Sequence, residues 1–163
     1  IKNSNLYTMT VEEFNKTKNR YDFIYLGDVL EHLSEPIEII KKLVEKINTG
    51  GYLCIEGPLE RNISFANYCV LLNSFIKNKF ISSTSASHPP LHLIFVGMNQ
   101  QINFFNKFNN LKLVKYNLYE TGWPLISGSV LNNLLGKISK LLSTIPFFKL
   151  FYGNRIRIIL KKK

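Results

Sequence analysis

The sequence has few cysteines and no long hydrophobic run, and each shortage excludes a class of protein. Cys54 and Cys69 are the only cysteines and no CxxC spacing is present, so neither a disulfide framework nor a zinc site is indicated. Lys, Asn or Ser interrupts every apolar stretch before it reaches the roughly 18 residues that a membrane-spanning helix needs. We therefore expect a globular protein of the reducing cytoplasm.

Acidic residues are scarce after Glu60, which divides the chain electrostatically. Residues 1–60 contain ten of the eleven acids and sum to −3, whereas residues 61–163 contain one acid, Glu120, and sum to +13. A basic surface of this kind attracts phosphate groups, anionic lipid or nucleic acid. Scattered lysines also accumulate by drift in A+T-rich genomes, so the charge does not by itself decide between a binding role and none.

The start of the sequence lacks Met and any targeting signal. Residues 1–9 begin with Ile1 and show neither the apolar core of a secretory signal nor the Arg-rich pattern of a transit peptide. We expect that the sequence was cut from a longer protein. At 163 residues and 45% hydrophobic content, it suffices for one core, so residues 1–163 are predicted to form a single, partial domain.

Alternating strand and helix patterns predict an α/β fold. Tyr21–Leu26 is almost continuously apolar and aromatic, as expected of a parallel strand buried on both faces, and Tyr52–Glu56 is a second strand. Between them, Ser-Glu-Pro at 34–36 marks a helix start, and apolar residues recur at helical spacing until the glycine pair at 50–51. A strand, a helix and a strand at this spacing predict a parallel sheet with a right-handed crossover.

The remaining segments continue this pattern. Further strands are predicted at Asn5–Thr8, Leu111–Tyr119 and Arg155–Leu160, and further helices at Ile63–Phe80 and Asn99–Phe108. An insert of about 124–152 separates the last two strands and contains a strongly amphipathic helix over Val130–Ile145. We expect this helix to pack as a lid over the sheet edge. The alternative is a surface-seeking helix at an anionic membrane interface.

The segment YDFIYLGDVLEHLSEPIEIIKKLVEKINTGGYLCIEGP, residues 21–58, resembles the strand-four to strand-five region of class I S-adenosylmethionine-dependent methyltransferases. It is most similar to the ubiquinone-type and saccharide-cluster groups. The shared features are an apolar strand, a small residue with an acid, Glu-His, an acid-Pro pair, a helix and Gly-Gly. The segments HLIFVGMNQQINFFNKFNNLKLVKY and GNRIRIILKKK resemble later blocks of that family, beginning with a His-led apolar strand and ending with the closing strand. The resemblance implies a Rossmann-like sheet, incomplete at the N-terminus, with an antiparallel final strand.

The same resemblance implies a cofactor site for S-adenosylmethionine. Leu26, Gly27 and Asp28 are expected to line it at the strand end, and Thr10 and Val11 to lie in the loop that passes the adenine ring, although the family has an acid where Thr10 stands. The family's glycine-rich loop and ribose-binding acid are not in the sequence. They would occupy roughly 60 or more upstream residues, so this chain alone is expected to bind the cofactor weakly or not at all and to be inactive.

Three histidines are candidates for the catalytic base. Methyl transfer mainly requires alignment of donor and acceptor, and a base helps when the acceptor is a hydroxyl. His92, which aligns with the family's His-led strand, and His88 are candidate bases, and each has a satisfied loop histidine as its alternative. His32 either faces the acceptor or ties the turn together. Trp123 and Tyr119 are candidate walls of the acceptor site, and each has a role in the core as its alternative. No metal site is expected.

Three functions remain open. The favoured one is methyl transfer to a small molecule, with a hydroxyl of a saccharide or lipid-linked precursor as the expected acceptor. A non-catalytic methyltransferase-like binding domain is the second. A nucleic-acid methyltransferase is disfavoured, because Gly27-Asp28-Val29-Leu30 stands where amino-methylating enzymes have an Asn/Asp-Pro-Pro-aromatic tetrad.

Overall fold

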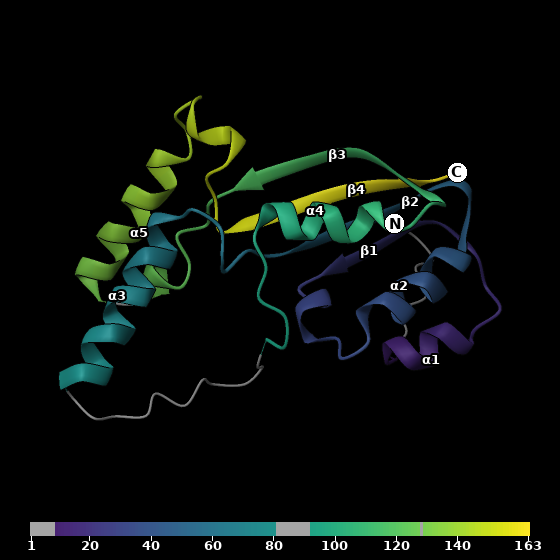
Figure 1. Ribbon diagram of the computed structural model, residues 1–163, viewed down its shortest axis with the longest axis horizontal. Helices are drawn as coiled ribbons and strands as arrows, with labels where there is room; N and C mark the ends of the chain where they lie inside the picture. The colour runs from purple at the N-terminus through teal and green to yellow at the C-terminus, as the bar shows by residue number, and fades with distance from the viewer. Residues whose placement is uncertain (1–8, 81–91, 128) are drawn as a thin grey trace, which may run out of the picture.

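The computed structural model describes residues 9–80, 92–127 and 129–163 (Figure 1). Its four-stranded sheet has the order β1-β2-β4-β3, formed by β1 (Tyr21–Gly27), β2 (Ile47–Pro58), β4 (Arg155–Lys162) and β3 (Leu111–Tyr119). The helices are α1 (Val11–Lys16), α2 (Pro36–Glu45), α3 (Phe65–Phe80), α4 (Met98–Asn106) and α5 (Val130–Leu142). Short 3₁₀ turns occupy Leu30–His32, Leu125–Ser127 and Phe148–Leu150. The predicted strand Asn5–Thr8 lies outside the described residues.

The predicted parallel unit is confirmed. β1 pairs with β2 in parallel, with Leu26 opposite Ile55 and Gly27 opposite Glu56, and α2 connects the two strands. Pro36 occupies the first turn of α2 as expected. β4 runs antiparallel to both β2 and β3, so the α/β fold class with an antiparallel final strand is also confirmed.

The helix of this unit ends earlier, and the next strand begins earlier, than the glycine pair predicts. α2 ends at Glu45, and β2 begins at Ile47, which is fully buried and lies opposite Tyr21. Gly51 therefore lies within a strand. A Cβ atom there would approach the carbonyl oxygen of Asp22 to 2.8 Å, so this position needs glycine because two strands meet closely.

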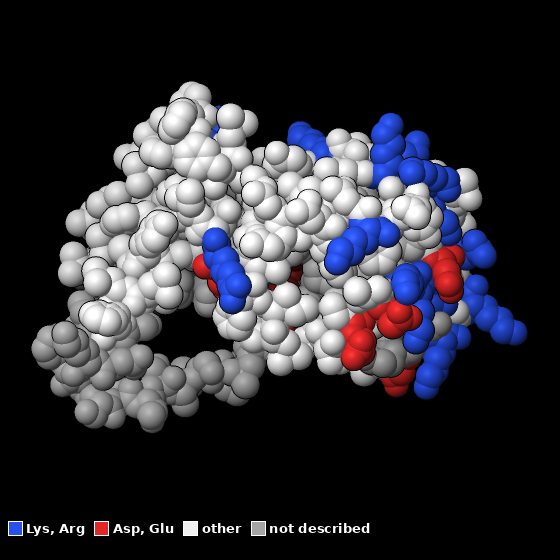
Figure 2. Space-filling model, viewed as in Figure 1, with Lys and Arg blue, Asp and Glu red and all other residues white. Residues whose placement is uncertain are grey.

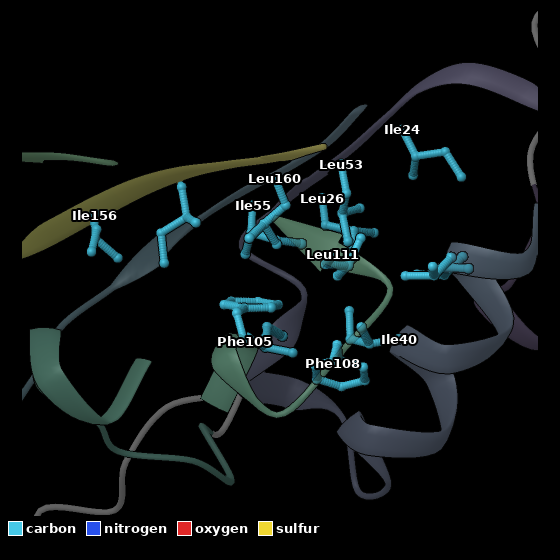
Figure 3. Packing of buried hydrophobic residues seen from close by; sticks show 14 of the residues in the cluster. Ile24, Leu26, Ile40, Leu53, Ile55, Phe105, Phe108, Leu111, Ile156 and Leu160 are labelled. Atoms are coloured by element: carbon cyan, nitrogen blue, oxygen red, sulfur yellow. The ribbon is translucent and has the colours of Figure 1, made fainter. Parts of the chain in front are cut away.

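One face of the sheet carries the hydrophobic core. Alternate residues of each strand point to this face, where α2 and α4 cover them (Figures 1 and 3). Phe105 of α4 and Phe108, which follows that helix, pack together with ring centroids 6.4 Å apart. The core residues of the strands include Ile24, Leu26, Leu53, Ile55, Ile156, Ile158 and Leu160.

The other face of the sheet carries Phe23, Tyr25 and Tyr52, all of which are exposed. In the described part of the chain no helix covers this face, and α1, α2 and α4 all lie on the core side (Figure 1). The expectation that Tyr21–Leu26 is buried on both faces is therefore wrong for the described residues, because alternate side chains of β1 reach solvent.

The lid predicted over the sheet edge is also not observed. α5 packs against the 125–127 turn and against α3, and these two helices project beyond the carboxyl end of β1 (Figure 1). Gly136 and Ser139 form the buried side of α5, Leu135 and Leu142 are partly buried, and the rest of the apolar stripe is exposed.

Replacement of Ile158 tests the position of the core. Ile158 is fully buried between the strands and the helices, so Ile158→Ala should lower the free energy of unfolding by about 2–5 kcal/mol. Ile159 is the matched control, because it follows on the same strand and points to the other face. Ile159→Ala should cost about 1 kcal/mol or less in denaturant unfolding. Equal losses for the two variants would contradict the assignment of faces.

Candidate functional site

The carboxyl end of β1 places the predicted cofactor residues at the sheet edge. Leu26 points into the core, so only its backbone is at this edge. Asp28 has a φ of 53°, in the left-handed region that Asp tolerates better than most residues, and its N–H donates to the carbonyl oxygen of Glu56 at 2.9 Å. The side chain of Asp28 is left more than half exposed at the end of the strand.

An ion pair connects Asp28 to the last strand. Nη2 of Arg155 donates to Oδ1 of Asp28 at 2.5 Å, although 127 residues separate them. Nε of Arg155 donates to the hydroxyl of Tyr119 at 3.1 Å, and that hydroxyl donates to Oε1 of Glu56. Arg157 binds the other oxygen of Glu56. One chain of charged and polar groups thus crosses the ends of all four strands.

This network shifts the pKa values of Tyr119 and Glu56. Burial, followed by the hydrogen bond to Glu56, raises the pKa of Tyr119 to about 12. Partial burial works against ionisation of Glu56, but hydrogen bonds from Arg157 and Tyr119 outweigh it and lower the pKa of this carboxyl group. Glu56 is therefore an anion, and Tyr119 a neutral donor, at neutral pH.

Two predicted site histidines lie together beyond the strand ends. The rings of His32 and His92 meet edge to face with centroids 4.9 Å apart. Nδ1 of His92 lies 2.5 Å from Oε1 of Glu60, while Oε2 of Glu60 is buried and has no hydrogen-bond partner among the described residues. Glu31 is buried beside both histidines, and this burial raises its pKa.

The segment that carries His92 is a loop, and the expected His-led strand is wrong. Residues 92–97 form no strand. Instead of pairing with a strand, the N–H groups of Leu93 and Ile94 both donate to the carbonyl oxygen of Glu31, at 2.8 and 3.2 Å. These bonds hold His92 against His32. His88, the other candidate base, lies outside the described residues.

A small pocket, the strand-end pocket, opens between these two groups. Its volume is about 50 Å³, and its walls include Pro58, Glu60, His92, Thr121, Trp123 and Arg155. Arg155, one of the wall residues, also binds Asp28, so its side chain connects the pocket wall to the end of β1. Trp123, a candidate wall of the acceptor site, lies on the wall of this pocket. A wider groove of about 480 Å³ between α2 and α4 has mainly apolar walls, and Lys107 is the titratable side chain among them.

The histidine cluster also has the composition of a metal site, which the sequence did not indicate. Three possible ligand atoms lie within 4.8 Å of one another, one each from Glu31, His32 and His92. Ligands of a tetrahedral metal at about 2.1 Å are separated by only about 3.5 Å, so binding would require them to draw together. His92 is separated from the other two by about 60 residues of sequence, and therefore no ligand spacing was visible.

The other two predicted cofactor residues occupy a helix start. The side chain of Thr10 accepts from the N–H of Glu13 at 3.1 Å, and the carboxylate of Glu13 accepts from the N–H of Thr10 at 2.7 Å, a capping box. Val11 begins α1, which packs against α2. Within the described residues, no hydrogen bond or ion pair joins Thr10 or Val11 to Gly27 or Asp28.

Comparison with known families identifies the class of protein. Residues 1–88, more than half of the chain, match the family model described as "Methyltransferase domain". The chain therefore belongs to the methyltransferase domain family. The Rossmann-like fold class expected from the sequence is thereby confirmed. No curated protein matches the chain.

Several solved structures are similar to the chain. They include a SAM-dependent methyltransferase from Archaeoglobus fulgidus, at 18% identity and a TM-score of 0.46, covering 96% of this chain and 66% of that one. TehB from Haemophilus influenzae is 14% identical with a TM-score of 0.44, covering 96% and 40%. The plantazolicin methyltransferase BpumL, in complex with a triazolic desmethylPZN analog and SAH, is 14% identical with a TM-score of 0.46, covering 95% and 57%. The chain thus spans 40 to 66% of these three structures.

The raised pKa of Tyr119 predicts a loss of stability at alkaline pH. The folded state favours the neutral phenol of Tyr119. The stability that this preference contributes is fully present below the ordinary pKa of 10.0 and is lost as pH rises through about 12. Tyr119→Phe should therefore lose less stability than the wild type over this range in thermal unfolding. Tyr116, an exposed tyrosine of the same strand, supplies the control, and Tyr116→Phe should keep the steep fall. A wild-type slope in Tyr119→Phe would contradict the network.

Proposed function

We propose that the protein transfers the methyl group of S-adenosylmethionine to a hydroxyl of a small molecule, such as a saccharide or a lipid-linked precursor. The observation that carries the proposal is the His92–Glu60 pair on the wall of the strand-end pocket, with Nδ1 and Oε1 2.5 Å apart. Arg155 joins this pocket to Asp28, at the strand end where parallel sheets bind their ligands.

The residues at the end of β1 suit one side of a cofactor with a sulfonium and an ammonium group. Gly27 has no Cβ, and the carboxylate of Asp28, which Arg155 binds through Oδ1, remains more than half exposed. A carboxylate is the appropriate group near cationic atoms. S-Adenosylmethionine, when bound, supplies an electrophilic methyl group. Thr10 and Val11, at the start of α1, are proposed to lie near its adenine ring.

The His92–Glu60 pair would act as a general base on the acceptor hydroxyl. When the N–H at Nδ1 of His92 donates to Glu60, the lone pair of the ring is at Nε2, which can accept a proton from an incoming hydroxyl. Glu60 then stabilises the imidazolium that forms and keeps the ring oriented. The unpartnered Oε2 of Glu60 can accept a hydrogen bond from a second hydroxyl of the acceptor. Such pairs of hydroxyls are typical of saccharides.

A divalent cation at Glu31, His32 and His92 is a second way to activate the same hydroxyl. It would lower the pKa of a bound hydroxyl, and Glu60 would orient His92 as a metal ligand. We favour the general base, because the 2.5 Å contact is already formed whereas the three ligand atoms are spread over as much as 4.8 Å.

Replacement of His92 tests the proposed role directly. In the full-length protein, His92→Ala should reduce the turnover number by about 10²–10⁴-fold while leaving the affinity for S-adenosylmethionine unchanged. Leu93 is the matched control, since it is an exposed neighbour on the same loop, and Leu93→Ala should retain nearly full turnover. Methyl transfer is measured with radiolabelled cofactor, and cofactor affinity by calorimetry.

Three results would contradict parts of this proposal. Unchanged turnover in His92→Ala would remove His92 from catalysis. Loss of wild-type turnover on chelation, restored by Mg²⁺ or Mn²⁺, would transfer its role from base to metal ligand. Cofactor binding without transfer to any hydroxyl acceptor would favour the alternative of a non-catalytic binding domain.

A further inference from the structure

The apolar side of α5 faces solvent. Exposed fractions are 88% for Val130, 64% for Leu131, 55% for Leu134, 39% for Ile138 and 67% for Leu141. Spacings of three and four residues place these side chains within one arc of the helix. The opposite side holds the buried Gly136 and Ser139, so the amphipathic helix has its apolar stripe directed outward.

Specific contacts hold α5 in this orientation. The hydroxyl of Ser139 accepts from the N–H of Ala66 at 3.1 Å and lies 2.8 Å from the hydroxyl of Tyr152, which accepts from the N–H of Phe65 at 3.1 Å. Two N–H groups at the start of α3, which have no partner within that helix, are thereby satisfied. Rotating the apolar stripe inward would break the two bonds of the Ser139 hydroxyl.

Gly136 adds a steric constraint to the same side of the helix. A Cβ atom there would lie 2.6 Å from the side chain of Ile126 and 3.1 Å from the carbonyl oxygen of Gly122. The turn over residues 122–126 thus fits directly against α5. The outward direction of the apolar stripe therefore follows from both close packing and hydrogen bonding.

The charges around this surface have one sign. Residues 62–80 and 122–152, here called the helical lobe, contain five lysines and no Asp or Glu. Lys137 and Lys140 of α5 are exposed next to the apolar stripe. Figure 2 shows the viewed face of this lobe as largely uncharged, whereas acidic and basic side chains gather at the opposite end of the molecule.

Large apolar side chains continue beyond α5. Phe147 and Leu150, on either side of Phe148 and Lys149, are 71% and 72% exposed, and Trp123 is exposed on the turn that precedes α5. Phe and Trp beside Lys are the side chains that settle at the boundary between lipid headgroups and acyl chains.

We infer that the helical lobe docks on an anionic lipid bilayer, with α5 lying along the surface and its apolar stripe inserted between headgroups. A second copy fits this surface poorly, because a two-fold contact through α5 would bring Lys137 and Lys140 toward their own copies without an acid to pair with them. Anionic headgroups would neutralise the same lysines. No helix within the described residues is long and apolar enough to span a membrane, which is consistent with docking along the surface. The inference does not depend on methyl transfer.

Vesicle flotation of the full-length protein tests this docking. The wild type should float with vesicles of phosphatidylcholine and phosphatidylglycerol, and far less with phosphatidylcholine alone. Val130→Ser/Leu141→Ser should weaken the binding by about tenfold or more, because it removes two exposed apolar anchors. Lys137→Gln/Lys140→Gln should weaken it by about fivefold per lysine. Val114→Ser, at an exposed apolar residue of β3, should bind as the wild type does.

The following outcomes would overturn the proposed docking. Failure of the wild type to bind anionic vesicles would do so, as would equal binding by Val130→Ser/Leu141→Ser with its thermal midpoint unchanged. A concentration-dependent dimer in sedimentation that dissociates in the same variant, without vesicle binding by the wild type, would identify a second copy as the occupant.

Discussion

The direction of the strands determines where the functional side chains of this chain meet. Because β1 pairs with β2 in parallel, Asp28 and Glu60 both follow strands that end at the same sheet edge. β4 runs the opposite way and begins at that edge with Arg155, where β3 ends with Tyr119. The ion pair between Asp28 and Arg155 and the hydrogen bonds of Tyr119 follow from this arrangement. If β4 were parallel, Arg155 would lie at the far edge and the network could not form.

Local patterns in the sequence predicted most of the sheet, whereas contacts between distant segments were not predictable. Short apolar runs rich in aromatic and β-branched residues identified the strands that begin at Tyr21, Leu111 and Arg155, because such composition is a property of neighbouring residues. Glu60 and Arg155 were not recognised as site residues, since their partners His92 and Asp28 lie 32 and 127 residues away. A single sequence carries no pairing signal over such distances.

The orientation of the amphipathic helix α5 was likewise not predictable from the sequence. Its apolar stripe was visible in the sequence, and burial of that stripe is the usual outcome. The structure reverses this outcome, because Ser139 and Gly136 make contacts that the apolar residues cannot make. The hydroxyl of Ser139 satisfies an N–H group of α3, and Gly136 admits the 122–126 turn. A pattern of hydrophobicity thus shows which side is apolar but not which side the protein buries.

A crystal structure of the full-length protein with S-adenosylhomocysteine would locate the site of methyl transfer. We expect the thioether sulfur to lie within contact distance of Gly27 or Asp28, on the side that faces the strand-end pocket. The cofactor product bound elsewhere, or with its sulfur directed away from His92, would contradict the assignment of this sheet edge as the site of methyl transfer.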